Sequence, residues 1–223
     1  MDKKDLDFLR EVLPFWEKLE PSQQKLLEDN AALKTYEAGE SLHSGDMDCS
    51  GLFVLQNGRI RVFMISDSGK EVTLYRLLER DVCLFSASCI FNNITFTLNV
   101  EAETKTQAIL IPTAVFEKLN KNSLPVSDFV NKIMAARMSD AMWVMEQVLF
   151  SSFDRRLAMF LLDQANLVGS DTLIITHEAI ANHLGSAREV VTRMLKYFAE
   201  EGMVQVHRGG LVITDRKKLS ALV

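Results

Sequence analysis

The sequence predicts an α+β protein in three parts: an N-terminal jelly-roll β-barrel in residues 1–124, a long helix in residues 125–150, and a winged helix-turn-helix in residues 151–223. Short β-type segments separated by turn residues predict the barrel. A change to helical spacing after Pro125 predicts the long helix. Two short helical stripes joined through Gly185 predict the helix-turn-helix.

The barrel region begins after two short helices. An opening helical pattern stops at Pro14, and a second helix is expected after Pro21. Segments rich in β-branched and aromatic residues then recur at 52–55, 60–65, 72–77, 96–102 and 108–111. The turns at Asn57-Gly58 and at residues 67–69 supply residues that tolerate positive φ, as hairpin turns require. The spacing predicts antiparallel strands.

The long helix carries an apolar seam. Its residues are spaced 4, 3, 4 and 3 apart, as in a coiled coil: Met134, Met138, Ala141, Met145 and Val148. The seam covers about two heptads, so spacing alone fits equally a dimer helix and a helix packed on its own barrel. Residues 150–153 indicate a hinge, and Asp154 is expected to cap the next helix.

Residues 175–212 contain the strongest signal. Thr176 is a suitable N-cap, and Gly185 stands where a helix needs a left-handed residue to end. We expect Ser186 to cap the second helix, with Glu189 at the capping-box position. An apolar stripe marks the core-facing side of that helix: Ala187, Val191, Met194, Leu195 and Phe198.

The opposite side of the second helix suits DNA. Arginine can bond the N7 and O6 acceptors of guanine, and a carboxylate can accept from the N4 amine of cytosine, so Arg188, Glu189 and Arg193 are candidate base-contacting residues. Capping and base contact are both open for Glu189. Segments 203–206 and 211–214 are expected to form a wing with a basic tip. Candidate contacts to the DNA backbone are Thr176, Thr192, Lys196, His207 and Arg208.

Composition and charge agree with such a protein. The chain has 223 residues, of which 48% are hydrophobic and 25% charged, which excludes a disordered or disulfide-rich chain. No apolar run approaches the roughly 18 residues of a membrane span, and three cysteines fit a reducing compartment, so we expect a soluble cytoplasmic protein with no membrane partner. The net charge of -5 belongs to the N-terminal part, because residues 151–223 hold 9 basic and 8 acidic side chains.

The order of barrel, long helix and winged helix-turn-helix resembles the cyclic-AMP-receptor / fumarate-nitrate-reduction regulator (CRP/FNR) family. The resemblance is carried by Gly45-Asp46, by residues 52–58 and 67–71, and by the motif from Ile175 through Arg193. It implies a cyclic-nucleotide-binding-like sensor barrel, a homodimer joined through the long helix, double-stranded DNA as the target, and RNA polymerase as a partner. The Arg-Glu-x-x-x-Arg pattern is similar to the cyclic-AMP receptor branch and implies palindromic, TGTGA-like half-sites, with Arg188 and Arg193 reading guanine and Glu189 reading cytosine.

The sensor departs from both well-known branches. Phe96 stands where the resemblance places the phosphate-binding arginine, and Ala141-Met142 stand where it places a hydroxyl pair, so cyclic AMP is not expected. Cysteine is absent before Cys49, which disfavours an iron–sulfur cluster. The effector and any cofactor therefore stay unidentified. A possible effector pocket comprises Cys83, Phe85, Ser86, Cys89, Phe96 and Thr97, although most of these residues equally describe barrel core.

Two alternatives remain open, and a third is disfavoured. A redox- or metal-responsive regulator would use Cys49, Cys83 and Cys89. A constitutive DNA-binding dimer would use the barrel only as a scaffold. An enzyme of the cupin type would need clustered metal ligands, whereas His43 is the only histidine of the barrel, so no enzymatic activity is expected.

Overall fold

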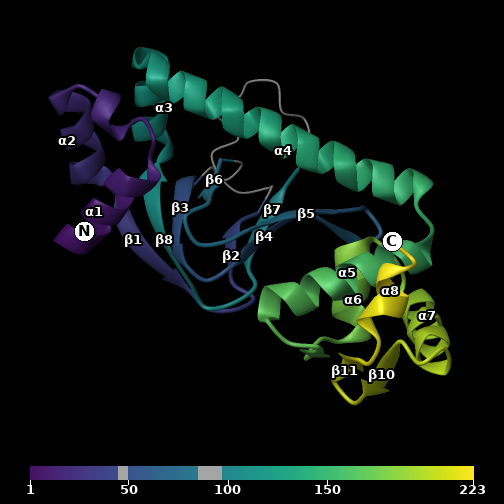
Figure 1. Ribbon diagram of the computed structural model, residues 1–223. Coiled ribbons are helices and arrows are strands. Elements are labelled where there is room, and N and C mark those ends of the chain that lie inside the picture. Colours follow the sequence, from purple (N-terminus) through teal and green to yellow (C-terminus); the bar gives the residue numbers. More distant parts are fainter. Residues whose placement is uncertain (45–49, 85–96) are drawn as a thin grey trace. The chain divides into compact units, whose positions relative to one another are not determined.

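A computed structural model describes residues 1–44, 50–84 and 97–223 of the chain (Figure 1). The chain divides into two compact units. The first comprises residues 1–64 and 74–141, and the second comprises residues 65–73 and 142–223.

The first unit is a β-structure covered by helices. Its helical elements are α1 (Lys3–Val12), η1 (Trp16–Lys18), α2 (Pro21–Asn30), α3 (Thr113–Asn122) and the first part of α4 (Leu124–Phe150). Its strands are β1 (Ala32–Tyr36), β2 (Ser41–His43), β3 (Gly51–Asn57), β4 (Ile60–Ile65), β5 (Glu71–Leu77), β6 (Val82–Cys83), β7 (Asn99–Ala102) and β8 (Thr106–Pro112). The end of β4 and the start of β5 belong to residues 65–73, which are counted with the second unit.

These strands form two four-stranded sheets, and each pairing that the structure describes is antiparallel. One sheet has the order β1-β8-β3-β6 and the other has the order β2-β7-β4-β5. In the first sheet Phe53 pairs with Leu110, and in the second Val62 pairs with Val100. In both sheets, strands that lie side by side are often far apart in the chain, as β8 and β3 are. This arrangement is typical of a jelly-roll and not of a simple meander, as the sequence predicts.

Strand β3 shows why the sequence folds in this way. Successive side chains of a strand point to opposite faces. Phe53 and Leu55 accordingly join the core between the two sheets, whereas Leu52 and Val54 join a second core beneath helices α1 to α4. Both faces of β3 are buried, which explains why this strand is a continuous apolar run instead of an alternating one.

The second unit contains the helix-turn-helix. Its elements are the end of α4, α5 (Phe153–Val168), β9 (Thr172–Leu173), α6 (His177–Leu184), α7 (Arg188–Glu200), β10 (Val204–His207), β11 (Gly210–Ile213) and α8 (Arg216–Ser220). The three strands form an antiparallel sheet in the order β10-β11-β9. One apolar core joins helices α5, α6, α7 and α8 to the sheet, and it includes the fully buried Leu157, Leu161, Ile180, Leu195 and Phe198.

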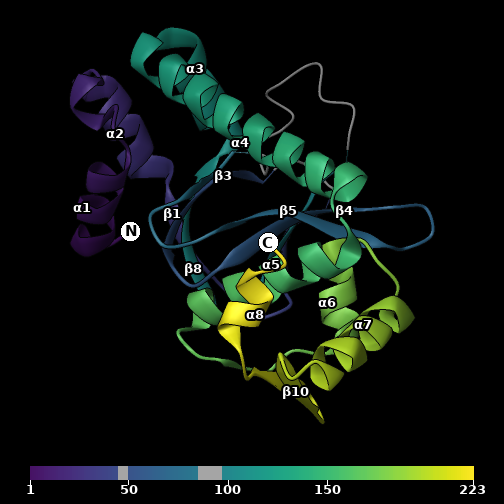
Figure 2. The ribbon, with the colours of Figure 1, turned by 45° about the vertical axis from the view of Figure 1, so that its right-hand side comes forward.

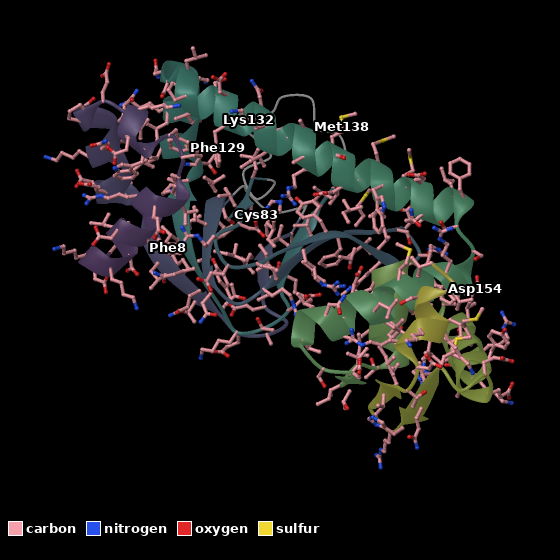
Figure 3. All side chains as sticks on the ribbon, viewed as in Figure 1. Phe8, Cys83, Phe129, Lys132, Met138 and Asp154 are labelled. Carbon is pink, nitrogen blue, oxygen red and sulfur yellow. The ribbon has the colours of Figure 1, made fainter. Side chains whose placement is uncertain are left out.

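The predicted elements correspond closely to these. Strands β3, β4, β5, β7 and β8 overlap the expected barrel segments, and β10 and β11 overlap those expected for the wing, while β1, β2, β6 and β9 were not predicted. The expected cap at Asp154 is wrong. Helix α5 begins at Phe153 with Ser152 as the N-cap residue, so Asp154 lies in the first turn, where the side chain of Ser152 lowers the pKa of its carboxyl group. Figure 3 labels Asp154 at this position.

Within the described part of the chain, every helix is too short or too polar to cross a membrane.

Candidate nucleic-acid interface

Helix α6 is bounded by the two residues that the sequence predicts. The side chain of Thr176 accepts a hydrogen bond from the backbone N–H of Ala179 at 3.1 Å, which satisfies one of the unpaired donors of the first turn. Gly185 ends the helix with φ of +64°, in the left-handed region that favours glycine. Ile180 and Ala181 are buried and attach the helix to the core of the second unit.

Helix α7 begins later than the capping-box pattern predicts. Its N-cap residue is Ala187, and no side chain caps it. The backbone N–H of Ser186 instead donates to the carbonyl of Ala181, so Ser186 belongs to the C-terminal cap of α6. The expected capping box of Ser186 and Glu189 is therefore wrong, and the carboxylate of Glu189 is left exposed to solvent.

The polar residues of α7 share one exposed face. Its buried side is formed by Val191, Leu195 and Phe198. At 100° per residue the candidate DNA-contacting side chains fall within an arc of about 140°. All of them are exposed: Arg188, Glu189, Thr192, Arg193 and Lys196. Figure 2 shows α7 lying beside α6 at the surface of the unit.

The two arginines of this face are available to a ligand. Among the described residues neither Arg188 nor Arg193 forms an ion pair, and Lys196 has only a 3.8 Å contact with the exposed Glu200. Exposed pairs of this kind contribute little to stability. The guanidinium groups can therefore enter a groove without first breaking an internal salt bridge.

A hydrogen-bonded chain that the sequence reading missed connects α6 to this face. The hydroxyl of Thr192 donates to the backbone carbonyl of Arg188 at 2.9 Å, and Nδ1 of His177 lies 2.8 Å from the same hydroxyl oxygen. Burial, with a further effect of the positive charge on Arg188, lowers the pKa of His177. The available signal was a histidine directly after the N-cap of the first helix.

The wing forms where the sequence predicts it. Strands β10 and β11 pair from Val204 with Ile213 to His207 with Gly210, and Arg208 and Gly209 form the tip. His207 and Arg208 are exposed. Gly210 is required because a Cβ atom there would lie 2.2 Å from the carbonyl oxygen of Leu173. The strand β9 thus holds the wing close to the core.

The possible effector pocket is only partly described. Phe85, Ser86, Cys89 and Phe96, like Cys49, lie outside the described residues. Cys83 pairs with Phe53 and is fully buried in the core between the sheets (Figure 3), whereas Thr97 is exposed. Among the described residues no group of three or more histidine, cysteine, aspartate and glutamate side chains could hold a metal ion.

A polar cluster that the sequence did not indicate lies close to Cys83 in the first unit. The guanidinium of Arg137, on α4, lies 4.6 Å from the centre of the Tyr75 ring and contacts Asp140 at 2.9 Å. Burial raises the pKa of Tyr75, and the cysteine contributes in the same direction. Arg137 therefore joins the helix to strand β5 by a cation–π contact.

The candidate seam residues of α4 fall into two groups. Met134 packs against both cores of the first unit, and Ala141 is half-buried. Met138, Met145 and Val148 are exposed, as Figure 3 shows for Met138. Further exposed apolar side chains on the same helix are Met142, Trp143, Leu149 and Phe150.

Two family models match the chain. The model of the cyclic nucleotide-binding domain matches residues 33–123, and the model of the Crp-like helix-turn-helix domain matches residues 155–222. The chain is 24% identical over 199 residues to electron transport regulator A of Shewanella oneidensis, covering 85% of this chain and 77% of that protein. It is 22% identical over 195 residues to the global nitrogen regulator of a Nostoc strain, covering 84% and 87%.

Solved structures of similar fold agree with these sequence matches. A crystal structure from Eubacterium rectale, of a protein assigned to the CRP/FNR family of transcriptional regulators, is 45% identical and matches with a TM-score of 0.93 over 95% of this chain and 98% of that one. The c-di-GMP-responsive regulator CLP of Xanthomonas campestris has the same fold at 15% identity, with a TM-score of 0.72 over 88% and 100%.

Proposed function

Because this chain belongs to the CRP/FNR family of transcription regulators, we propose that it acts as a homodimer that reads palindromic, TGTGA-like half-sites and that an effector in its N-terminal barrel controls the affinity. The chain is a DNA-binding regulator and not an enzyme. The half-site sequence, the dimer and the effector control are what we propose for it.

The observation that carries the half-site proposal is the shared exposed face of Arg188, Glu189 and Arg193 on α7. A recognition helix presents its N-terminal residues to base edges in the major groove. Arg188 and Arg193 supply donors for the N7 and O6 atoms of guanine, and Glu189 supplies an acceptor for the N4 amine of cytosine. The absence of a capping box leaves the Glu189 carboxylate available for that contact.

The residues proposed to contact the DNA backbone surround this face. Thr176 stands at the N-terminus of α6, Lys196 on α7, and His207 and Arg208 at the wing tip. Thr192 also lies on α7 and would contact the DNA backbone through its methyl group, because its hydroxyl hydrogen is donated to the carbonyl of Arg188. All five are exposed. Such contacts set the position of a protein on the duplex without reading its sequence.

The proposed dimer uses the exposed apolar side of α4. Two copies related by a two-fold axis would present two recognition helices about one DNA turn apart, roughly 34 Å, to successive major grooves. An effector can control this arrangement only if its affinity differs between two arrangements of the dimer. The full burial of Cys83 favours a packing role over a redox role for this thiol. As in other family members, RNA polymerase is the proposed partner at promoters.

Selection from a pool of randomised duplexes tests the half-site. We expect a palindrome with TGTGA-like halves for the wild type. Arg193→Ala should lose the preference for one guanine per half-site, at a cost of roughly 1–3 kcal/mol, whereas Lys196→Ala should weaken all sequences about equally. Selected sequences without a guanine preference would refute the assignment.

A second experiment separates a sensor from a constitutive dimer. Affinity for the operator duplex is measured with a panel of metabolites and with oxidised and reduced protein. An affinity that changes with one of them indicates a sensor, and an unchanged affinity indicates a constitutive dimer.

A further inference from the structure

We propose that His177 makes a proton-coupled contact with a DNA phosphate, so that each subunit takes up one proton when the regulator binds DNA. The proposal rests on the proposed function only in requiring that α6 and α7 face a duplex, and it does not depend on which half-site sequence is read.

The hydrogen bonds around Thr192 determine which nitrogen of His177 carries a proton. A hydroxyl has one hydrogen, and that of Thr192 is donated to the backbone carbonyl of Arg188, which can only accept. Toward His177 the hydroxyl oxygen must therefore accept, so Nδ1 is the donor in their 2.8 Å hydrogen bond. The neutral ring then has no hydrogen on Nε2.

This tautomer decides what the ring can offer to DNA. Nε2 without a hydrogen is an acceptor, and a phosphate oxygen is also an acceptor, so the neutral ring cannot bond a phosphate through Nε2. A second proton converts Nε2 into a donor and gives the ring a positive charge. Charge-assisted hydrogen bonds to phosphate are about twice as strong as neutral ones. A phosphate contact by His177 thus requires protonation.

The position of His177 in the motif makes such a contact possible. The residue is the first of α6 and follows the exposed N-cap Thr176. In a helix-turn-helix the first helix crosses the DNA backbone while the second enters the groove. Nε2 of His177 has no hydrogen-bond partner in the described part of the chain and is not among its buried polar atoms. It is accordingly open to a ligand from outside.

The charges next to His177 favour the neutral ring as long as DNA is absent. Arg188 lies on α7, which packs against α6, and its positive charge adds to burial in lowering the pKa of His177. Arg193 lies one residue beyond Thr192 on the same helix, and Glu178 follows on the histidine's own helix. A phosphate would reverse this balance because its negative charge favours the imidazolium.

Protonation of His177 and DNA binding should favour each other. The pKa of His177 is below its ordinary value in the DNA-free protein and rises in the complex, so DNA binding takes up protons at pH values between the two. Affinity should increase as the pH falls from 8 toward 6, by at most about tenfold per pH unit for each proton taken up. The gain ends once the pH falls below the pKa of the DNA-free protein.

The test is a titration by fluorescence anisotropy at constant ionic strength from pH 6 to 8. Two duplexes of equal length are used, one with TGTGA-like palindromic halves and one scrambled. Since phosphate contacts do not read sequence, we expect the same pH slope with both. His177→Asn keeps an amide donor for Thr192 but lacks Nε2, so it should bind with a much smaller slope. His177→Arg, which is charged at every pH, should bind at pH 8 about as the wild type does at pH 6.

Controls separate His177 from other titrating groups. His207→Asn removes the exposed histidine of the wing and should keep a larger slope than His177→Asn. Calorimetry in buffers of different ionisation enthalpy should report close to one proton per subunit for the wild type and fewer for His177→Asn. An unchanged slope in His177→Asn, or a wild-type affinity that does not vary with pH, would overturn the proposal. Equal affinity for the two duplexes with the slope retained would refute the half-site alone.

Discussion

The dimer proposal makes a prediction whose size can be worked out from the exposed side of α4. Four apolar side chains, with exposed fractions of 67, 49, 47 and 63%, are Met138, Met142, Met145 and Leu149. At 100° per residue they fall within an arc of about 60°, whereas Trp143, with 48% exposed, lies about 140° from Met138. The perturbation is the double substitution Met142→Ser and Met145→Ser.

Its magnitude follows from the surface left to bury. Full burial of a methionine side chain contributes about 1.5–3 kcal/mol, and about half of each side chain is still exposed in the protomer, so each contributes roughly 0.7–1.5 kcal/mol on dimerisation. Two substitutions on each of two helices then cost about 3–6 kcal/mol. The dimer Kd should increase by roughly two to four orders of magnitude.

Sedimentation equilibrium over a range of concentrations measures this Kd. Trp143→Ser is the matched control, because it removes an equally exposed and larger apolar side chain from another face of the same helix. It should change the dimer Kd by less than about tenfold. Circular dichroism must show that the helix content of each variant is unchanged. A double variant that dimerises like the wild type, or a Trp143→Ser variant that weakens the dimer as strongly, would refute a dimer joined through this side of α4.

Two further predictions concern stability. Gly210→Ala places a Cβ atom 2.2 Å from the carbonyl oxygen of Leu173, so it should lower the free energy of unfolding of the wing-bearing unit by about 3 kcal/mol; Gly209→Ala meets no atom within 4 Å and should cost only the left-handed backbone, roughly 1–2 kcal/mol. Urea unfolding followed by circular dichroism compares the two, and a Gly210→Ala variant as stable as the wild type would contradict the geometry. Burial lowers the pKa of His43, so the unfolded chain binds this proton more readily than the folded protein, and stability should fall as the pH decreases below the unfolded value of about 6.5. In His43→Gln the dependence of the urea midpoint on pH between 8 and 5 should become weaker, though not vanish, because His177 is shifted in the same direction. A midpoint with the same pH dependence in both proteins would show that His43 is not the group responsible.

Much of the second unit could be predicted from local sequence. The ends of α6 depend on a side-chain cap at Thr176 and on positive φ at Gly185, and both requirements are met by the residue itself. The wing and the exposed face of α7 follow from periodicity in the same way. Ser186 is an exception: the Gly185 turn brings its N–H to the carbonyl of Ala181, five residues earlier, and only the folded turn reveals this contact.

In the first unit, local sequence patterns do not predict every strand. Strands β2 and β6, of three and two residues, exist because Val100 and Phe53 of other strands pair with them, so their own residues carry little signal.

The sequence by itself determined the family, the order of the parts, the ends of α6 and the set of polar residues on α7, because each depends on the properties of residues close together in the chain. Only the tertiary structure decided which apolar residues of α4 are covered, placing Met134 against the barrel cores and leaving Met142 exposed. Only the tertiary structure shows the hydrogen bond between His177 and Thr192, which lie fifteen residues apart in the chain. Contacts of both kinds arise from packing between distant segments, and periodicity within one segment cannot specify its partner.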